Sequence, residues 1–352
     1  MINMKSVSES IKSSVKSFGL PRVIIALFLV SLFVLGGIYK IPTGSSINDV
    51  IVRFGMNGIL VLSMIPMIQS GCGLNFGIPV GIIGGLLGAV ISLEVGATGL
   101  FGVGVAIALA VVFSSVFGIL YGMLLNKVKG DEMIVATYIG FSFVALMNIM
   151  WLVLPFANPS SVQGFKGEGL RATISVEDYW IKSISGILSI KVTKYLTIPT
   201  GMIILFILMS LFVWLFFKTK TGTAITAVGS NQEYARAAGI NVNKMRVIST
   251  AISTALASVG IVVYQQSFGF IQMFNAPNSF VFPSVAAILL GGASVNKATI
   301  VNVIIGTFLF QGILTMTPTV INSIVQVDVS EIVRIVVSNG MIVYALTRKS
   351  NE

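Results

Sequence analysis

Residues 99–126 read GLFGVGVAIALAVVFSSVFGILYGMLLN, and this stretch decides the class of protein. It contains no charged residue, and about 20 consecutive apolar residues are enough for an α-helix to cross a membrane. Its apolar residues do not alternate with polar ones, as they would along the strands of a membrane β-barrel. The stretch therefore predicts a transmembrane helix.

The whole chain has the same character. Of its 352 residues, 55% are apolar and only 10% are charged, whereas roughly a quarter are charged in a soluble protein. The mean hydropathy is +0.97. These values exclude a water-soluble enzyme and a disordered protein. Cys72 is the single cysteine and histidine is absent, so an internal disulfide and the usual zinc ligand are excluded as well.

Further apolar runs are bounded by charged or turn residues along the rest of the chain. The predicted spans are residues 23–39, 55–70, 76–93, 99–126, 133–155, 197–217, 247–265, 281–293, 299–320 and 332–347. Two Gly-rich breaks, near 71–76 and 267–281, could instead be half-helices or re-entrant turns. The predicted fold class is all-α, a polytopic membrane protein with about ten transmembrane helices.

The basic residues predict an orientation. With ten spans and the N-terminus inside, 14 of the 22 Lys and Arg residues fall on the cytoplasmic side, as the positive-inside rule requires. Five of the other eight lie in one long outer loop, 156–196. The net charge of +10 is thus an orientation signal, and no clustered basic face points to a nucleic acid. Both termini are predicted to be cytoplasmic.

The predicted organisation is one transmembrane domain, 23–347, followed by a cytoplasmic tail, 348–352. A cytoplasmic loop, 218–245, interrupts the domain. Residues 1–22 form a cytoplasmic N-terminal segment, in which Val7, Ile11, Val15 and Phe18 recur at helical spacing. This spacing favours an amphipathic helix on the membrane surface, and a partly ordered tail is the alternative.

No set of residues typical of a catalytic site is visible, and no cluster predicts a metal site. Residues 291–299 lack the second glycine of a phosphate loop, so we interpret Gly291 and Gly292 as structural glycines at a helix end. If ATP energises this protein, the ATPase must therefore be another chain. Ionisable residues are nearly absent from the middle of the spans, which argues against an ion-coupled carrier, although backbone carbonyls can bind sodium.

Polar uncharged side chains inside the spans are the candidates for lining a translocation pathway. The predicted pathway residues are Asn75, Phe76, Asn148, Gln265 and Gln311. Hydrogen bonding between helices is the alternative for each amide. For Asn75, which follows a Gly-rich break, the alternative is a helix cap that shapes the turn.

The cytoplasmic stretch 218–245 contains a predicted short helix. Ser230 or Asn231 can cap its start, and Glu233 lies in its first turn. Alanines keep the helix narrow, and Gly239 can end it in the left-handed conformation. Such a helix suits insertion into a groove of a partner protein; an ordinary structured loop is the alternative.

Three motifs resemble one family. Residues 229–242, GSNQEYARAAGINV, resemble the coupling segment of permease subunits of ATP-binding cassette importers, in the ribose and simple-sugar branch related to nucleoside and branched-chain amino-acid permeases. Residues 286–294, AAILLGGAS, resemble that family's second signature. Residues 71–77, GCGLNFG, fall where sugar permeases have Gly-Gly-Ile-Asp-Leu-Ser-Val-Gly, with Asn75 in place of the aspartate. The resemblance covers about residues 50–345.

The resemblance implies a membrane subunit of an importer in the bacterial cytoplasmic membrane. Its partners would be a second permease, identical or related, ATP-binding cassette ATPase subunits that use ATP-Mg, and an extracytoplasmic solute-binding protein. This chain would bind no cofactor and would not be an enzyme. The residues that contact the ATPase would be Gly229, Ser230, Asn231, Glu233, Ala235, Arg236, Ala237, Gly239 and Ile240.

The predicted cargo is a small polar solute, with a monosaccharide placed first. Nucleosides, branched-chain amino acids and other small metabolites are the alternatives within the same importer class. An ion-coupled carrier or channel, and a scaffold subunit without a pathway, are the hypotheses from other classes. An ATPase partner would distinguish the importer from both.

Overall fold

The computed structural model describes residues 20–128, 130–156, 158, 173–193, 195–325 and 328–348. The predicted amphipathic helix near the N-terminus lies almost entirely outside these residues. The helices are α2 (Leu20–Ile38), α3 (Thr43–Leu62), α4 (Met64–Gln69), α5 (Ile78–Glu94), α6 (Gly99–Leu125), α7 (Glu132–Val153), α9 (Thr200–Lys218), α10 (Lys220–Ser230), α11 (Gln232–Ala237), α12 (Val242–Phe268), η1 (Ala276–Phe280), α13 (Val281–Leu290), α14 (Ile300–Val325) and α15 (Ser330–Arg348). Short strands are β1 (Thr173–Ser175), β2 (Ile190–Thr193), β3 (Leu196–Ile198) and β4 (Phe270–Gln272).

Each predicted apolar run coincides with a helix. Within the described residues, six helices are long and apolar enough to cross a membrane: α3 continued by α4, α6, α7, α9, α12 and α14. Three further apolar helices are shorter, Arg22–Ile38, Ile78–Glu94 and Ala276–Leu290. The chain is thus a multi-pass helical membrane protein, and the number of ten spans stays a prediction.

Three boundaries differ from the prediction. The second run was expected to begin near residue 55, but α3 begins at Thr43. The prediction missed the first part of α3 because it carries the charged Asp49 and Arg53, which hydropathy excludes from a span. The stretch 218–245 is two helices, α10 and α11, rather than a loop with one helix. The short run at 281 is preceded by the 3₁₀ turn η1.

The centre of the bundle is α12, which packs against α3, α5 and α6. Small residues permit this packing: a Cβ added to Gly84 of α5 would lie 2.7 Å from the Cβ of Ser114 on α6. The Ser114 hydroxyl in turn donates to Ser258 of α12 at 2.9 Å. Lipid supplies no hydrophobic force between helices, so close contacts and hydrogen bonds of this kind hold a membrane bundle together.

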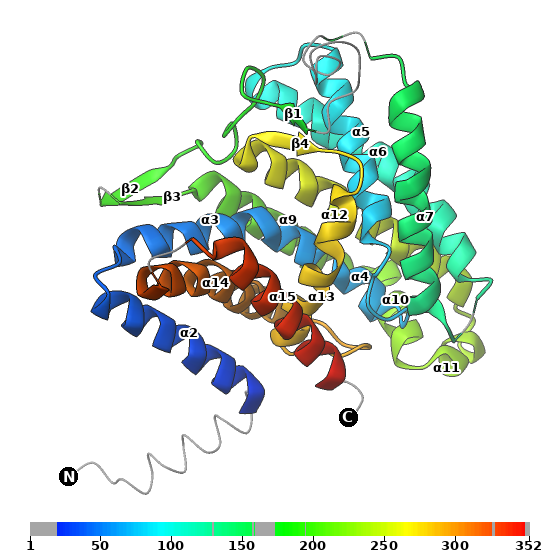
Figure 1. The fold of residues 1–352 in the computed structure, drawn as a ribbon. Coiled ribbons are helices and arrows are strands. Elements are labelled where there is room, and N and C mark those ends of the chain that lie inside the picture. The colour runs from blue at the N-terminus through cyan, green and yellow to red at the C-terminus, as the bar shows by residue number, and fades with distance from the viewer. Residues whose placement is uncertain are drawn as a thin grey trace, which may run out of the picture.

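Four short strands correct the all-α prediction. β1 pairs antiparallel with β4, with Ile174 opposite Ile271, and β2 pairs with β3. Residues 173–175 and 190–193 are strands because their backbone groups find partners in β4 and β3. Figure 1 shows the strands at one end of the bundle and α10 and α11 at the other. We call these the strand end and the α11 end.

Candidate functional site

The segment α10–α11 projects from the α11 end between α9 and α12. Thr219 caps α10 by accepting from the backbone N–H of Gly222 at 3.2 Å. Asn231, rather than Ser230, caps α11 and accepts from the N–H of Tyr234 at 2.9 Å. Gly239 has a φ of 79° and follows the helix, as predicted for a left-handed C-terminal turn. Both ends of α11 are thereby fixed by local hydrogen bonds and backbone geometry.

The side chains of α11 divide into a buried and an exposed set. Ala235 is fully buried and packs with Val228 and Val242, so it anchors α11 to its own chain. This burial is incompatible with the predicted contact of Ala235 with a partner. The predicted contact residues that are exposed are Asn231, Glu233, Arg236, Ala237 and Gly239. Ser230 is exposed as well, whereas Gly229 and Ile240 are half-buried.

Tyr234 is the most prominent side chain on this surface, and the sequence prediction omitted it. Its side chain is 70% exposed although it is large and aromatic. The sequence does contain a signal that could have identified Tyr234, because it is an aromatic residue in a short polar segment outside the predicted spans. Exposed tyrosines of this kind are enriched among the residues that dominate binding energy at protein interfaces.

The end of α10 packs backbone to backbone against the break between α4 and α5. A Cβ added to Gly229 would overlap the carbonyl oxygen of Gln69 and lie 3.0 Å from the nitrogen of Gly71. Gly71 has a φ of 74°, and its own Cβ would lie 3.1 Å from the Cα of Gly229. A movement of α10 must therefore displace the 69–71 backbone.

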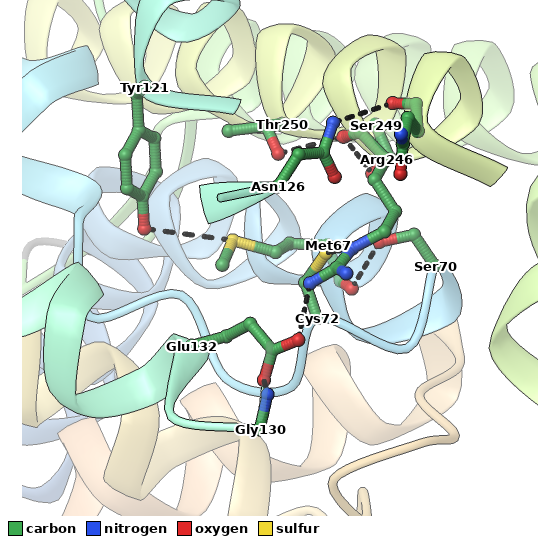
Figure 2. A network of polar contacts seen from close by, with 11 residues as sticks. Met67, Ser70, Cys72, Tyr121, Asn126, Gly130, Glu132, Arg246, Ser249 and Thr250 are labelled. Carbon is green, nitrogen blue, oxygen red and sulfur yellow. Dashed lines mark hydrogen bonds and ion pairs between the residues drawn. The ribbon is translucent and has the colours of Figure 1, made fainter. Parts of the chain in front are cut away.

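A buried ion pair adjoins the break between α4 and α5 at Cys72 (Figure 2). Arg246 of α12 is 1% exposed, and its guanidinium contacts the Glu132 carboxylate of α7 at 2.6 Å. The Arg246 Nε also donates to the Cys72 thiol at 3.0 Å. We call Cys72, Glu132 and Arg246 the arginine cluster. It joins the start of α7, the first turns of α12 and the Gly-rich break at one point.

Asn75 extends this polar region into the core. It is fully buried, and its amide nitrogen donates to Ser253 of α12 at 2.8 Å. Its oxygen accepts from the Tyr121 hydroxyl of α6 at 3.2 Å, and Ser253 donates onward to the Ser63 carbonyl. These contacts favour a packing role for Asn75. A pathway role stays a prediction.

A cavity of about 900 Å³ lies near the strand end, where Gln272 of β4 contributes to its wall. Its walls come from α3, the end of α12, η1, α13, α14 and α15. Four charged side chains line it, two acidic and two basic: Asp49, Arg53, Glu331 and Arg334. The amides that line it are Asn57, Gln272, Asn278, Gln311 and Asn339. Aromatic rings complete the walls: Tyr264, Phe268, Phe280, Phe282 and Phe310.

Of the five predicted pathway residues, only Gln311 lines this cavity. Phe76 lies behind it, with its ring 6.0 Å from that of Phe282. Asn148 contacts the Asn275 side chain at 3.1 Å, which ties α7 to the segment before η1. Gln265 is 1% exposed, and neither polar atom of its side chain has a hydrogen-bond partner within the described chain. The structure therefore does not bring these five residues together.

The two predicted structural glycines end α13. Gly292 has a φ of 89°, and its carbonyl accepts from Arg22 at 3.2 Å. A Cβ at Gly291 would overlap the Asn302 carbonyl of α14. Both positions thus require glycine for the turn between α13 and α14. Among the described residues, no group of three or more Asp, Glu or Cys side chains could hold a metal ion.

Residues 46–346 match the family model described as "Branched-chain amino acid transport system / permease component". The chain belongs to this permease family. The match covers nearly all of the described helices, from the first turn of α3 to α15. The protein is thus a permease subunit of the ATP-binding cassette importer class, as the coupling-segment motif predicted.

Named relatives of the permease differ in their cargo. It is 24% identical to the ribose import permease protein RbsC of Escherichia coli (strain K12) over 76% of each chain. It is 25% identical to the nucleoside ABC transporter permease protein NupB of Lactococcus lactis, over 64% of this chain and 60% of that protein. Its match to the probable ABC transporter permease protein YphD of E. coli is 28% identical and spans 48% of that protein. No solved structure matches the permease.

Proposed function

We propose that the permease forms the translocation pathway of an importer for a small, uncharged polar solute. The observation that carries this proposal is the cavity at the strand end. Its two carboxylates and two guanidinium groups balance, so the cavity does not favour a solute of either net charge. Its amides offer both donors and acceptors, and its aromatic rings offer apolar faces.

A monosaccharide fits this chemistry first. Its hydroxyls pair with side-chain amides, and its C–H faces pack against aromatic rings. The similarity to a ribose permease supports this class. A nucleoside is the second candidate, because the rings of Tyr264 and Phe280 stand edge to face at 4.9 Å and extend an aromatic wall on which a base could stack. The similarity to a nucleoside permease supports this alternative.

Gln311 is the cavity amide whose loss we expect to matter most. It is only 6% exposed, and no hydrogen bond joins its amide to another residue in the described chain. Gln311→Leu removes this donor and acceptor at nearly constant volume. A lost hydrogen bond of about 1.4 kcal/mol corresponds to about a tenfold fall in uptake. The measurement is uptake of labelled ribose by the reconstituted importer, with nucleosides and leucine as competitors.

The matched control for Gln311 is Thr319→Val on the same helix. Thr319 is exposed, and its hydroxyl donates only to the Thr315 carbonyl one turn earlier. Both variants should assemble with the ATPase and hydrolyse ATP at the wild-type basal rate. Unchanged uptake by Gln311→Leu would contradict the pathway proposal. Stronger competition by a nucleoside than by ribose would favour the second candidate solute.

We further propose that α11 is the docking site for a separate ATPase subunit, which would place this end in the cytoplasm. ATP-driven movement of that partner would push α10 against the 69–71 backbone and rock the spans, opening the cavity to alternate sides. A second permease and an extracytoplasmic solute-binding protein would complete the importer. This chain itself would hydrolyse no ATP.

Tyr234→Ala tests the docking site. Truncating an aromatic anchor at an interface typically costs about 2 kcal/mol or more, which is roughly a thirtyfold loss of affinity. We expect the ATPase to be lost when it is co-purified with this variant at low concentration. Tyr195→Ala is the control, because Tyr195 is 59% exposed at the strand end. Equal ATPase recovery with both variants would show that α11 is not part of the interface. The argument for a cytoplasmic α11 end would then lose its support.

A further inference from the structure

An open groove runs between α6 and α12 and shares no lining residue with the cavity. It has a volume of about 660 Å³. Its lining residues are Ser115, Ile119 and Met123 from α6, Asn126 at the end of α6, Asn241 just before α12, and Asn243, Lys244, Val247, Ile248, Ala251, Ile252 and Ala255 from the first half of α12. The solute pathway and the docking of the ATPase do not account for this groove.

Small residues make the floor of the groove and larger ones its walls. Ser115, Ala251 and Ala255 leave a channel between side chains such as Ile119 and Ile252. The two helices cannot close this channel by rotating, because they already touch behind it. A Cβ added to Gly122 of α6 would lie 2.9 Å from the Cα of Val247 on α12. The groove is therefore a fixed feature of the helix pair.

The outer face of α6 beside the groove is apolar and exposed. Val112, Val116 and Leu120 are each more than half exposed. In a helix that crosses a membrane, such a face contacts lipid chains. The groove thus opens toward the hydrocarbon of the bilayer, along a surface where lipid is the surrounding solvent.

The length of the groove matches one leaflet. From Lys244 to Ala255 the helix advances eleven residues, which is about 16 Å at 1.5 Å per residue. The hydrocarbon core of a bilayer is about 30 Å thick, so one leaflet is about 15 Å. A single acyl chain that enters at the polar end would fill the groove to its far end.

The polar end of the groove carries one charge. Lys244 is the only charged side chain among the described residues that line it, and it is exposed. Asn241, Asn243 and Asn126 surround this end, and the Asn126 amide donates to the Asn243 carbonyl at 2.9 Å. Lys127 follows Asn126 and is exposed as well. An ammonium group above an apolar channel is complementary to an anionic headgroup above an acyl chain.

We propose that the α6–α12 groove is a binding site for an anionic phospholipid, with one acyl chain between the helices and the phosphate at Lys244. The lipid comes from the leaflet at the α11 end. The lipid would fill the space between the first turns of α12 and the last turns of α6, directly beside the segment that carries α11. The proposal does not depend on which solute is carried.

The test is lipid retention by the full permease. The protein is reconstituted in nanodiscs of phosphatidylethanolamine and phosphatidylglycerol at three to one, re-extracted in mild detergent, and its retained lipids are measured by mass spectrometry. We expect phosphatidylglycerol to be enriched several-fold over its share of the nanodisc. Lys244→Gln should reduce this enrichment to the nanodisc ratio, and Ala251→Phe should lower the retention of both lipids several-fold by filling the floor.

Two controls lie outside the groove. Val112→Phe places the same aromatic side chain on the exposed face of α6, and Lys191→Gln removes a charge from β2 at the strand end; both should retain lipid as the wild type does. Lys244 is exposed, so its variant keeps the test decisive even if Ala251→Phe folds poorly. Wild-type protein without enrichment, or a Lys244→Gln variant with undiminished enrichment, would overturn the proposal. A change of oligomeric state in Ala251→Phe would assign the groove to a second copy of the chain instead.

Discussion

Glu132→Gln should destabilise the permease by about 3–5 kcal/mol, because it leaves the Arg246 guanidinium buried without its counter-ion. Arg246 is 1% exposed, so water cannot replace the carboxylate. Arg246→Met should cost less, about 1–3 kcal/mol, because the Glu132 side chain that remains is 15% exposed and can be hydrated. The measurement is the free energy of unfolding in mixed micelles.

The double variant Glu132→Gln, Arg246→Met should regain most of the lost stability, since replacing both members of a buried pair is often nearly neutral. The matched control is Glu331→Gln. Glu331 contacts Arg334 at 2.7 Å, but their side chains are 66% and 47% exposed, so this change should cost less than about 1 kcal/mol. If Glu132→Gln is no more costly than Glu331→Gln, the arginine cluster does not hold the α11 end together.

Gly229→Ala should abolish coupled uptake. A single methyl group at this position overlaps the Gln69 carbonyl oxygen and crowds the Gly71 nitrogen, and both are backbone atoms that cannot rotate away. Overpacking of this kind costs about 1–3 kcal/mol or forces the helices apart. Either result moves α11 from its position, so we expect uptake to fall more than tenfold at unchanged expression.

The control for this change is Gly104→Ala. Gly104 also lies in a helix, but a Cβ there meets nothing within 4 Å. It should therefore leave transport and stability near wild type. Uptake and co-purification of the ATPase, measured for both variants, distinguish a specific contact from a general intolerance of alanine. Wild-type transport by Gly229→Ala would mean that α10 does not press on the 69–71 backbone.

Hydropathy was sufficient to predict the long apolar helices of the permease, because lipid imposes a local requirement on each segment. Residues 99–126 lack charge and become α6, whose bounds are Gly99–Leu125. The same rule placed the start of α3 too late, since Asp49 and Arg53 belong to the helix but face a cavity. A charged residue is excluded from lipid and is tolerated beside a polar cavity, and hydropathy does not separate the two cases.

Local signals also predicted the ends of α11. A cap by Asn231 and a left-handed Gly239 depend on residues close in sequence, and such signals are visible without a fold. The number of helices in this region was not predictable, because α10 is rich in threonine and glycine and its apolar face is narrow.

The sites formed by distant segments were not predictable. Arg246 lies between the predicted cytoplasmic loop 218–245 and the predicted span 247–265, yet it is buried against Glu132, which lies 114 positions earlier. Nothing in a single sequence pairs the two. The cavity likewise draws its residues from six helices, and only Gln311 of the predicted pathway set is among them. Which amides line the cavity depends on the packing of distant helices, and amide content alone does not choose among them.

The central helix α12 has a mechanical consequence. Its 27 residues form one element about 40 Å long, which is more than the thickness of the hydrocarbon core. One end carries Arg246 and follows α11, and the other carries Tyr264 at the cavity and continues into β4. Close glycine contacts hold its middle: a Cβ added to Gly81 of α5 would lie 2.5 Å from the Thr254 carbonyl oxygen, and one added to Gly118 of α6 would overlap the Thr254 hydroxyl. A rigid rod held in this way behaves as a lever. A small tilt imposed on the α11 end would swing Tyr264 in the opposite direction.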